Sequence, residues 1–318
     1  MKALVFDGQL SVKDIHIPVP RDDEALVKVG LAGICMTDKE IVKGYMNFNG
    51  VLGHEFVGHV ESAKDPSLLG KRVVGDINAG CMRCEFCLKG LQRHCSNRSV
   101  LGILSRNGAF AEYLTLPVGN LHIVPENIPD ESAVFVEPLA AALEIAEQIH
   151  VEPNLEVLIV GDGRLALLTC MVLRLTGCSI TVLGKHADKL KMFEAYSVNT
   201  MLFKDIDGMD KSYDMVVEAS GNPSGWQTAV KLVKPRGVIA LKSTYHGDFS
   251  FNPAPLVINE VSVIGSRCGQ FEPALRLLSS GLVDPRHLIS GIFEIDDSLR
   301  AFEAANSSNV FKILIKML

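Results

Sequence analysis

The sequence contains no run of apolar residues that approaches the roughly 18 needed to cross a membrane. Its first residues, MKALVFDGQ, contain neither a basic cluster nor the apolar core of a signal peptide, so we expect a cytoplasmic location and no membrane partner. The net charge of −6 is spread along the chain, which argues against a nucleic-acid partner. Fixed-period repeats and low-complexity tracts are also absent.

What the chain does contain is enough apolar sequence for more than one core. Of its 318 residues, 47% are apolar and 21% are charged, which is typical of a globular protein of about two domains. Residues 1–137 show short, alternating strand patterns, whereas in residues 138–268 apolar strand-like runs alternate with helical segments. This alternation predicts an α/β fold in which a parallel sheet is inserted into a β-rich domain formed by 1–137 and 269–318.

Half of the eight cysteines lie in one short segment, CMRCEFCLKGLQRHC, as Cys81, Cys84, Cys87 and Cys95. In a reducing compartment such a cluster indicates a metal site rather than disulfides. Four thiolates on one loop form a closed tetrahedron, so the pattern favours a structural zinc ion. An iron–sulfur cluster is an alternative, although its familiar run has a shorter last spacing and a proline after the last cysteine. Disulfides or free thiols are the other alternative.

A second group of candidate metal ligands is dispersed along the chain. Cys35 lies in GICMTDKE, His54 and Glu55 lie in GVLGHEFVGHV, and Glu137 interrupts the apolar run AVFVEPLAAALEIA. Cysteine, histidine and carboxylate side chains are zinc ligands, and three of them with a water make a catalytic site. Taken singly, each residue also has an ordinary interpretation as a core thiol, a hydrogen-bonded histidine or a helix-start carboxylate. Spacing alone does not join them.

The segment VLIVGDGRLALL places Gly161, Gly163 and Ala166 in a G-x-G-x-x-A pattern between an apolar strand and a helix. The first glycine permits a tight turn, the second allows the backbone to approach a pyrophosphate, and the small third residue allows close helix–strand packing. The helix N-terminus then binds the phosphates. In this context the pattern predicts a dinucleotide-binding loop.

The end of the next strand, in ITVLGKHADKL, has no carboxylate to bind the ribose of NAD. A cation stands there instead, which favours the 2′-phosphate of NADP over NAD; the alternative is that Lys185 is only a solvated loop charge. The residues that we expect to bind the cofactor are Gly161, Gly163, Arg164, Leu165, Ala166, Gly184, Lys185 and His186.

These motifs occur in one order: GICMTD, GHEFVGHV, the four-cysteine loop, EPLA and the glycine loop. Together they resemble the zinc-dependent medium-chain dehydrogenases, the family of alcohol, polyol, threonine and sugar dehydrogenases. The resemblance covers essentially the whole chain. It implies a GroES-like catalytic domain and a Rossmann domain with the active site between them, about two zinc ions per chain, and assembly into a homodimer or homotetramer.

The resemblance also assigns roles to residues. It makes Cys35, His54 and Glu137 the ligands of a catalytic zinc, which Glu55 coordinates directly or through water. Thr37 would hydrogen-bond the substrate alcohol and start its proton toward solvent, through the cofactor ribose or Glu40. With glutamate at the third ligand position, the chain resembles the polyol, threonine and sugar branches of this family.

We therefore expect an oxidoreductase that transfers a hydride between a primary or secondary alcohol, such as a sugar or polyol, and a nicotinamide cofactor. The alternative from another class is a non-catalytic nucleotide-binding or redox-sensing protein of the same fold. A zinc-free enone reductase would not need the dispersed metal ligands. Within the resemblance, Met36 stands where relatives have glycine and Glu40 where many have histidine, so the identity of the alcohol is not fixed.

Overall fold

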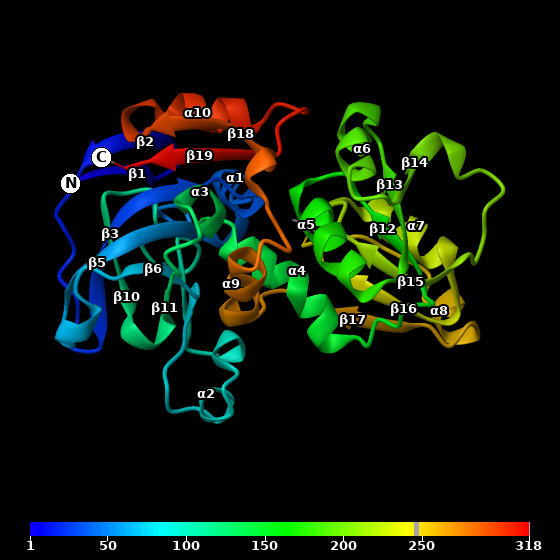
Figure 1. Ribbon diagram of the computed structural model, residues 1–318, viewed down its shortest axis with the longest axis horizontal. Helices are drawn as coiled ribbons and strands as arrows, with labels where there is room; N and C mark the ends of the chain where they lie inside the picture. Colours follow the sequence, from blue (N-terminus) through cyan, green and yellow to red (C-terminus); the bar gives the residue numbers. More distant parts are fainter. Residues whose placement is uncertain (245–247, 318) are drawn as a thin grey trace. The chain divides into compact units, whose positions relative to one another are not determined.

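Figure 1 shows the computed structural model of the chain, which describes residues 1–244 and 248–317. The chain folds as two compact units. Unit 1 contains residues 1–137 and 271–318, and unit 2 contains residues 138–270. The sequence pattern predicts the second seam two residues earlier, after residue 268. No helix in the described part of the chain is long and apolar enough to cross a membrane.

Unit 1 is built around a seven-stranded sheet whose strands follow the order β11-β6-β5-β3-β19-β18, with β10 paired to β3. All neighbours in this sheet are antiparallel except β18 and β19. The strands are β3 (Glu24–Gly33), β5 (Glu55–Ala63), β6 (Arg72–Gly75), β10 (Tyr113–Pro117), β11 (Leu121–Ile123), β18 (Ile289–Glu294) and β19 (Lys312–Lys316).

Two three-stranded sheets complete the strands of unit 1, in the orders β2-β1-β4 and β7-β8-β9. Their strands are β1 (Lys2–Phe6), β2 (Leu10–Asp14), β4 (Gly50–Val51), β7 (Asn78–Ala79), β8 (Ser99–Leu101) and β9 (Ser105–Arg106). The helices are α1 (Met36–Val42), α2 (Glu85–Leu88), α3 (Asp130–Ala133), α9 (Phe271–Ser279) and α10 (Ser298–Ala305). The segment that carries α2 extends away from the strands of its unit (Figure 1).

The sequence of strand β3, EALVKVGLAG, shows why this unit forms a sheet. Alternate residues of the strand are buried, as a strand with one face on a core requires. Its last three residues are all buried, and β5 and β19 pair with them along both edges of the strand. The buried end of β3 is the point from which the candidate metal site is built.

Unit 2 is a six-stranded sheet in the order β14-β13-β12-β15-β16-β17, with every neighbouring pair parallel. In chain order this is 3-2-1-4-5-6, the order of a dinucleotide-binding Rossmann fold. The strands are β12 (Glu156–Val160), β13 (Ser179–Gly184), β14 (Asn199–Leu202), β15 (Tyr213–Glu218), β16 (Val233–Leu241) and β17 (Ser262–Gly265). The helices are α4 (Val136–Gln148), which begins at the seam, α5 (Arg164–Leu173), α6 (Ala187–Glu194), α7 (Pro223–Leu232) and α8 (Ala254–Ile258).

The central strands of unit 2 are continuous apolar runs, since both faces of a parallel sheet are covered. Leu158, Val160, Val216 and Ile239 are fully buried and pack in one cluster with Trp226 of α7. The prediction of an α/β fold with a β-rich part and a doubly wound parallel sheet is confirmed.

Candidate active site and metal centres

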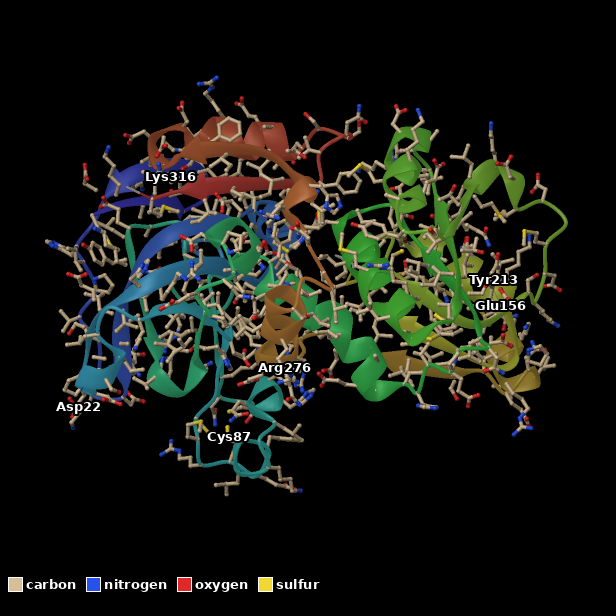
Figure 2. The ribbon with its side chains drawn as sticks, viewed as in Figure 1. Asp22, Cys87, Glu156, Tyr213, Arg276 and Lys316 are labelled. Carbon is tan, nitrogen blue, oxygen red and sulfur yellow. The ribbon has the colours of Figure 1, made fainter. Side chains whose placement is uncertain are left out.

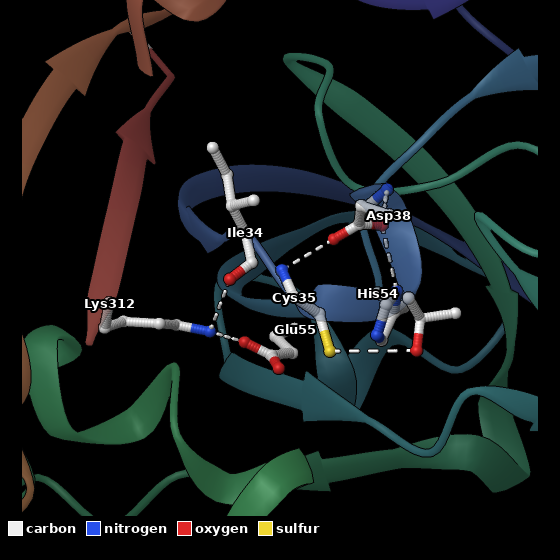
Figure 3. A network of polar contacts seen from close by, with 8 residues as sticks. Ile34, Cys35, Asp38, His54, Glu55 and Lys312 are labelled. Atoms are coloured by element: carbon white, nitrogen blue, oxygen red, sulfur yellow. Dashed lines mark hydrogen bonds and ion pairs between the residues drawn. The ribbon is translucent and has the colours of Figure 1, made fainter. Parts of the chain in front are cut away.

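Three of the dispersed ligand candidates come together in unit 1. One ligand atom each from Cys35, His54 and Glu55 lies within 4.8 Å of the other two. His54 and Glu55 are buried, and Cys35 is half-buried. Figure 3 shows the three side chains grouped beside the end of β3. Sulfur, nitrogen and oxygen at this spacing form the kind of donor set that zinc takes in catalytic sites.

The local fold explains how residues 19 positions apart meet. Gly33, the last residue of β3, pairs with Glu55, the first residue of β5, in the antiparallel ladder. Cys35 follows at the N-terminus of α1, where its N–H donates to Oδ2 of Asp38 at 2.7 Å. The other oxygen of Asp38 accepts the N–H of Gly53 at 3.2 Å. The fully buried Asp38 therefore ties the two ligand-bearing segments together.

The charges around His54 favour a positive group at this point. Nδ1 of His54 lies 3.2 Å from Oδ1 of Asp38. Burial acts to lower the pKa of the His54 imidazole, but the carboxylate of Asp38 and the thiolate of Cys35 outweigh it and hold that pKa well above its usual range. A site that raises the proton affinity of a buried imidazole in this way also favours a metal cation.

A buried lysine, which the sequence analysis missed, lies beside the same cluster. Lys312 of β19 is 1% exposed and forms an ion pair with the carboxylate of Glu55, and its Nζ lies 3.5 Å from the carbonyl oxygen of Ile34 (Figure 3). Burial lowers the pKa of Lys312 to about 8, although Cys35 and Asp38 act to raise it. At Gly33, a side-chain Cβ would approach Oε2 of Glu55 to 2.9 Å, so glycine leaves the space for this pair.

The charges of the cluster test whether a divalent metal fits. Ionised Cys35, Asp38 and Glu55 contribute three negative charges, against the one positive charge of Lys312. Buried charges are costly unless they are compensated. A dication bound by Cys35, Glu55 and a neutral His54 would bring the sum to zero. The residues present therefore fit a zinc ion in both their donor atoms and their charge.

The remaining residues that the resemblance placed here lie as follows. Thr37, in the first turn of α1, has its Oγ1 at 3.9 Å from Sγ of Cys35. Glu40 forms an ion pair with Lys43 at 2.8 Å. Glu137, in the first turn of α4, is half-buried and is not a member of the group within 4.8 Å. The structure thus assembles Cys35 and His54 with Glu55, which the resemblance named as a direct or water-mediated ligand, and the assignment of Glu137 stays a prediction.

The four-cysteine loop forms the second candidate metal site. One sulfur each of Cys81, Cys84, Cys87 and Cys95 lies within 4.8 Å of the others, and all four are free thiols. The loop connects β7 and β8 and includes α2, with Cys84 as its N-cap residue. Figure 2 shows Cys87 in this loop of unit 1.

The thiols of this loop differ in how readily they ionise. The backbone N–H of Arg83 is the main group that lowers the pKa of Cys81 to about 6, whereas burial raises the pKa of Cys87 to about 11. The N–H of Cys81 also donates to Sγ of Cys95 at 3.4 Å. Four sulfurs this close, some supported as thiolates by backbone donors, fit a structural zinc ion that has no open coordination position.

In unit 2 the glycine loop lies between β12 and α5, as the sequence predicts. Gly161 has φ of 129°, and a Cβ there would meet the carbonyl oxygen of Ala219 at 2.7 Å, so only glycine suits the turn. Gly163 is the N-cap residue of α5, Arg164 and Leu165 begin its first turn, and Ala166 is buried. The backbone N–H groups at a helix start suit a dinucleotide pyrophosphate.

At the end of β13 the structure adds a residue that the sequence analysis did not consider. Oδ2 of Asp162, from the glycine loop, accepts the backbone N–H groups of Lys185 at 2.7 Å and His186 at 2.8 Å. The ammonium of Lys185 lies 5.5 Å from the centre of the Phe203 ring. The sequence shows no carboxylate at the end of β13, but the structure places one beside Gly184. This carboxylate comes from the glycine loop that follows the neighbouring strand β12.

Comparisons with known proteins agree with these features. The alcohol dehydrogenase GroES-like domain family matches residues 21–126, and the zinc-binding dehydrogenase family matches residues 165–280. The D-arabinitol dehydrogenase 1 of Uromyces fabae is 27% identical over 99% of this chain and 97% of its own length.

Two solved structures show the same fold over nearly the whole chain. An alcohol dehydrogenase from Escherichia coli in complex with NADH has a TM-score of 0.92 and 26% identity, with 99% of each chain covered. A zinc-binding dehydrogenase from Sinorhizobium meliloti bound to NADP has a TM-score of 0.90 and 27% identity, covering 99% of this chain and 98% of its own. The two units are thus a GroES-like unit and a Rossmann unit, and the chain belongs to the zinc-dependent medium-chain alcohol dehydrogenase family.

Proposed function

We propose that the protein is a zinc-dependent oxidoreductase that transfers a hydride between a primary or secondary alcohol and a nicotinamide dinucleotide. The observation that carries the proposal is the grouping of Cys35, His54 and Glu55 within 4.8 Å in a chain whose other unit presents a dinucleotide loop. Either feature alone has other uses, but a mixed zinc donor set and a Rossmann loop together suit alcohol–carbonyl interconversion.

Cys35, His54 and Glu55 would hold the catalytic zinc. When bound, zinc supplies a Lewis acid that favours the deprotonated form of an alcohol. Lys312 holds Glu55 through an ion pair, and Asp38 accepts the backbone N–H of Cys35. Both ligands therefore keep their positions. The assignment of Glu137 as a ligand stays a prediction, and the geometry favours Glu55 in that place. The four-cysteine loop would hold the structural zinc, giving about two zinc ions per chain.

Thr37 is the group best placed to handle the hydroxyl proton. Its hydroxyl lies beside Cys35, is only partly buried, and can both accept and donate a hydrogen bond. We propose that Thr37 accepts the proton of the alcohol and passes it toward solvent. Glu40, about five sixths of a turn further along α1 and paired with Lys43, is a candidate for the next position on that route.

The substrate class that we propose is a sugar or polyol. The D-arabinitol dehydrogenase of Uromyces fabae and a sorbitol dehydrogenase of Halalkalibacterium halodurans, which is 26% identical over 99% of this chain, both carry polyol names. Glu55 in the donor set, next to His54, leaves the metal site without a second thiolate ligand. The alcohol and its carbonyl product would be the small-molecule partners.

The cofactor loop would bind a nicotinamide dinucleotide through Gly161, Gly163 and the start of α5. The family includes a relative with NADH and a relative with NADP. The preference for NADP that Lys185 predicts from the sequence stays a prediction. The bound nicotinamide supplies hydride transfer, and the residues of unit 2 supply only its binding and orientation.

We also propose that the protein forms a homodimer or homotetramer. β17 is an edge strand of the sheet of unit 2, with the side chain of Val263 40% exposed. The outer edge of such a strand, when it carries exposed apolar residues, is suited to pairing with a second copy of the chain. Size-exclusion chromatography with light scattering would measure the assembly.

A non-catalytic, nucleotide-binding role is the alternative, and the dehydrogenase names of the relatives do not favour it. The experiment that decides is a screen of sugars, polyols, 3-hydroxy amino acids and simple alcohols with NAD and NADP, run on the zinc-loaded protein. Turnover that is lost on replacing His54 but kept on replacing the exposed His16 supports the proposal. Dinucleotide binding with no turnover of any alcohol would support the alternative.

A further inference from the structure

The carboxylate of Asp162 lies at the point of unit 2 where dinucleotide specificity is decided. Its Oδ2 accepts hydrogen bonds from the backbone N–H groups of Lys185 and His186, at 2.7 and 2.8 Å, and lies 2.9 Å from Nδ1 of His186. The side chain is 12% exposed, although it comes from a loop. This carboxylate is therefore fixed in place by three contacts.

Gly184 makes this arrangement possible. A Cβ at this position would approach Cβ of Asp162 to 2.7 Å and Oδ2 to 2.8 Å. The carboxylate thus lies directly over the last residue of β13. In Rossmann folds an acidic residue at the end of this second strand binds the ribose 2′-hydroxyl of NAD. Here the strand ends in glycine, and the acid of the neighbouring glycine loop fills the space that the glycine leaves.

The donors that a 2′-phosphate would need are already engaged. The N–H groups of Lys185 and His186 precede α6 and both bind Asp162. The Lys185 ammonium lies over the Phe203 ring, at 5.5 Å from its centre. A phosphate at this point would meet a carboxylate in place of free N–H donors, and like charges in contact are strongly unfavourable.

We propose that Asp162 is the residue that makes this chain select NAD over NADP. The inference rests on the proposed function, in which a nicotinamide dinucleotide binds the loop between β12 and α5. It is the opposite of the preference that Lys185 predicts from the sequence. The carboxylate accepts a hydrogen bond from the ribose hydroxyl and repels the phosphate that replaces this hydroxyl in NADP.

The test is the equilibrium binding of NADH and of NADPH, measured by the fluorescence of the bound nicotinamide. The variant is Asp162→Asn, whose amide oxygen still accepts the N–H groups of Lys185 and His186 but carries no charge. The matched control is Asp188→Asn, because Asp188 is an exposed carboxylate in the first turn of α6 that forms an ion pair with Lys191. Circular dichroism and thermal melting confirm that each variant is folded.

We expect wild-type protein to bind NADH at least about tenfold more tightly than NADPH. Asp162→Asn should reduce that ratio by about tenfold, mainly by tightening NADPH, while Asp188→Asn leaves it unchanged. Tighter binding of NADPH by wild type, an equal change of both affinities in Asp162→Asn, or the same change in the control would overturn the proposal. If wild type bound neither nucleotide, the proposed function itself would fail.

Discussion

The two candidate metal sites of unit 1 offer a direct comparison, because the ligand atoms of each lie within 4.8 Å of one another but are assembled differently. The four cysteines lie within 15 residues on a loop that extends from the strands of the unit. Cys35, His54 and Glu55 come from the end of β3 and the start of β5, and Lys312 reaches them from β19. One site depends on a short segment, and the other depends on the whole sheet.

The difference in donors indicates a difference in task. Four sulfurs leave a metal no position for a substrate, so the loop can only stabilise. The mixed site offers three candidate ligands, a hydroxyl beside them, and a buried lysine and aspartate that hold two of them in place. Surrounding groups of this kind orient ligands and adjust the properties of a metal. The predictions below separate the two sites by what fails when each is disturbed.

The largest effect, a loss of folding stability, is expected from a change in the four-cysteine loop. Cys84→Ser removes one of four sulfur ligands, and structural zinc supplies roughly 10–16 kcal/mol of folding free energy in small zinc domains. We expect the variant to lose one zinc ion per chain and to unfold at a markedly lower temperature, as measured by elemental analysis and calorimetry. Cys178→Ser, at a buried thiol of unit 2, is the control and should retain the full zinc content. An unchanged melting temperature together with unchanged zinc would contradict the structural role.

Disturbing the mixed site should abolish turnover with little loss of fold. Cys35→Ser is expected to lower turnover by about a thousandfold or more, since a catalytic metal stabilises charge in the transition state by several kcal/mol. Binding of the dinucleotide, measured by fluorescence, should remain within about twofold of wild type, because its loop is in unit 2. Full activity in this variant would rule out the catalytic assignment.

Lys312 gives a sharper test of the mixed site, because its effect should depend on whether zinc is bound. Lys312→Met leaves the buried carboxylate of Glu55 without its ammonium partner, which costs about 3–5 kcal/mol in a buried pair. We expect this loss in zinc-free protein, measured by denaturant unfolding. In zinc-loaded protein the metal compensates Glu55, so the loss should be smaller. Equal losses in both forms would show that Lys312 and a metal do not share Glu55.

The smallest effect is expected at Thr37. Thr37→Val keeps the shape of the side chain and removes the hydroxyl, so proton transfer from the alcohol slows and kcat falls by about 10²-fold. Thr37→Ser retains the hydroxyl and should keep most of the activity. Zinc content should be that of wild type in both variants. A Thr37→Val enzyme with wild-type kcat would exclude Thr37 from the proton route.

The same contrast explains which parts of the two metal sites and of the dinucleotide loop could be predicted from the sequence. The cysteine loop and the glycine loop are contiguous, so their spacing alone predicted a metal site and a dinucleotide site. The mixed site needed the family resemblance, because no local pattern shows that the ends of β3 and β5 meet. The resemblance named both Glu137 and Glu55 with Cys35 and His54. The sheet register brings Glu55 close to Cys35, and the assignment of Glu137 stays a prediction.

Three functional candidates were missed because they act across elements. Asp38 joins two ligand-bearing segments, Lys312 extends from a distant strand, and Asp162 reaches from one loop to the end of the next strand. The sequence contained a signal for Lys312, because this residue begins a strand, KILIK, whose next three residues are apolar and buried. The charge of Asp162 between two loop glycines was also visible, but its contact with the end of β13 depends on the glycine at 184.

The most direct test of the account is zinc content measured together with turnover in three proteins: wild type, Cys35→Ser and Cys84→Ser. The account predicts about two zinc ions and activity in wild type, and about one zinc ion with no turnover but normal melting in Cys35→Ser. Cys84→Ser should have about one zinc ion and a lower melting temperature. A wild-type protein that is active with zinc in the cysteine loop alone would contradict the central claim that Cys35, His54 and Glu55 hold a catalytic metal.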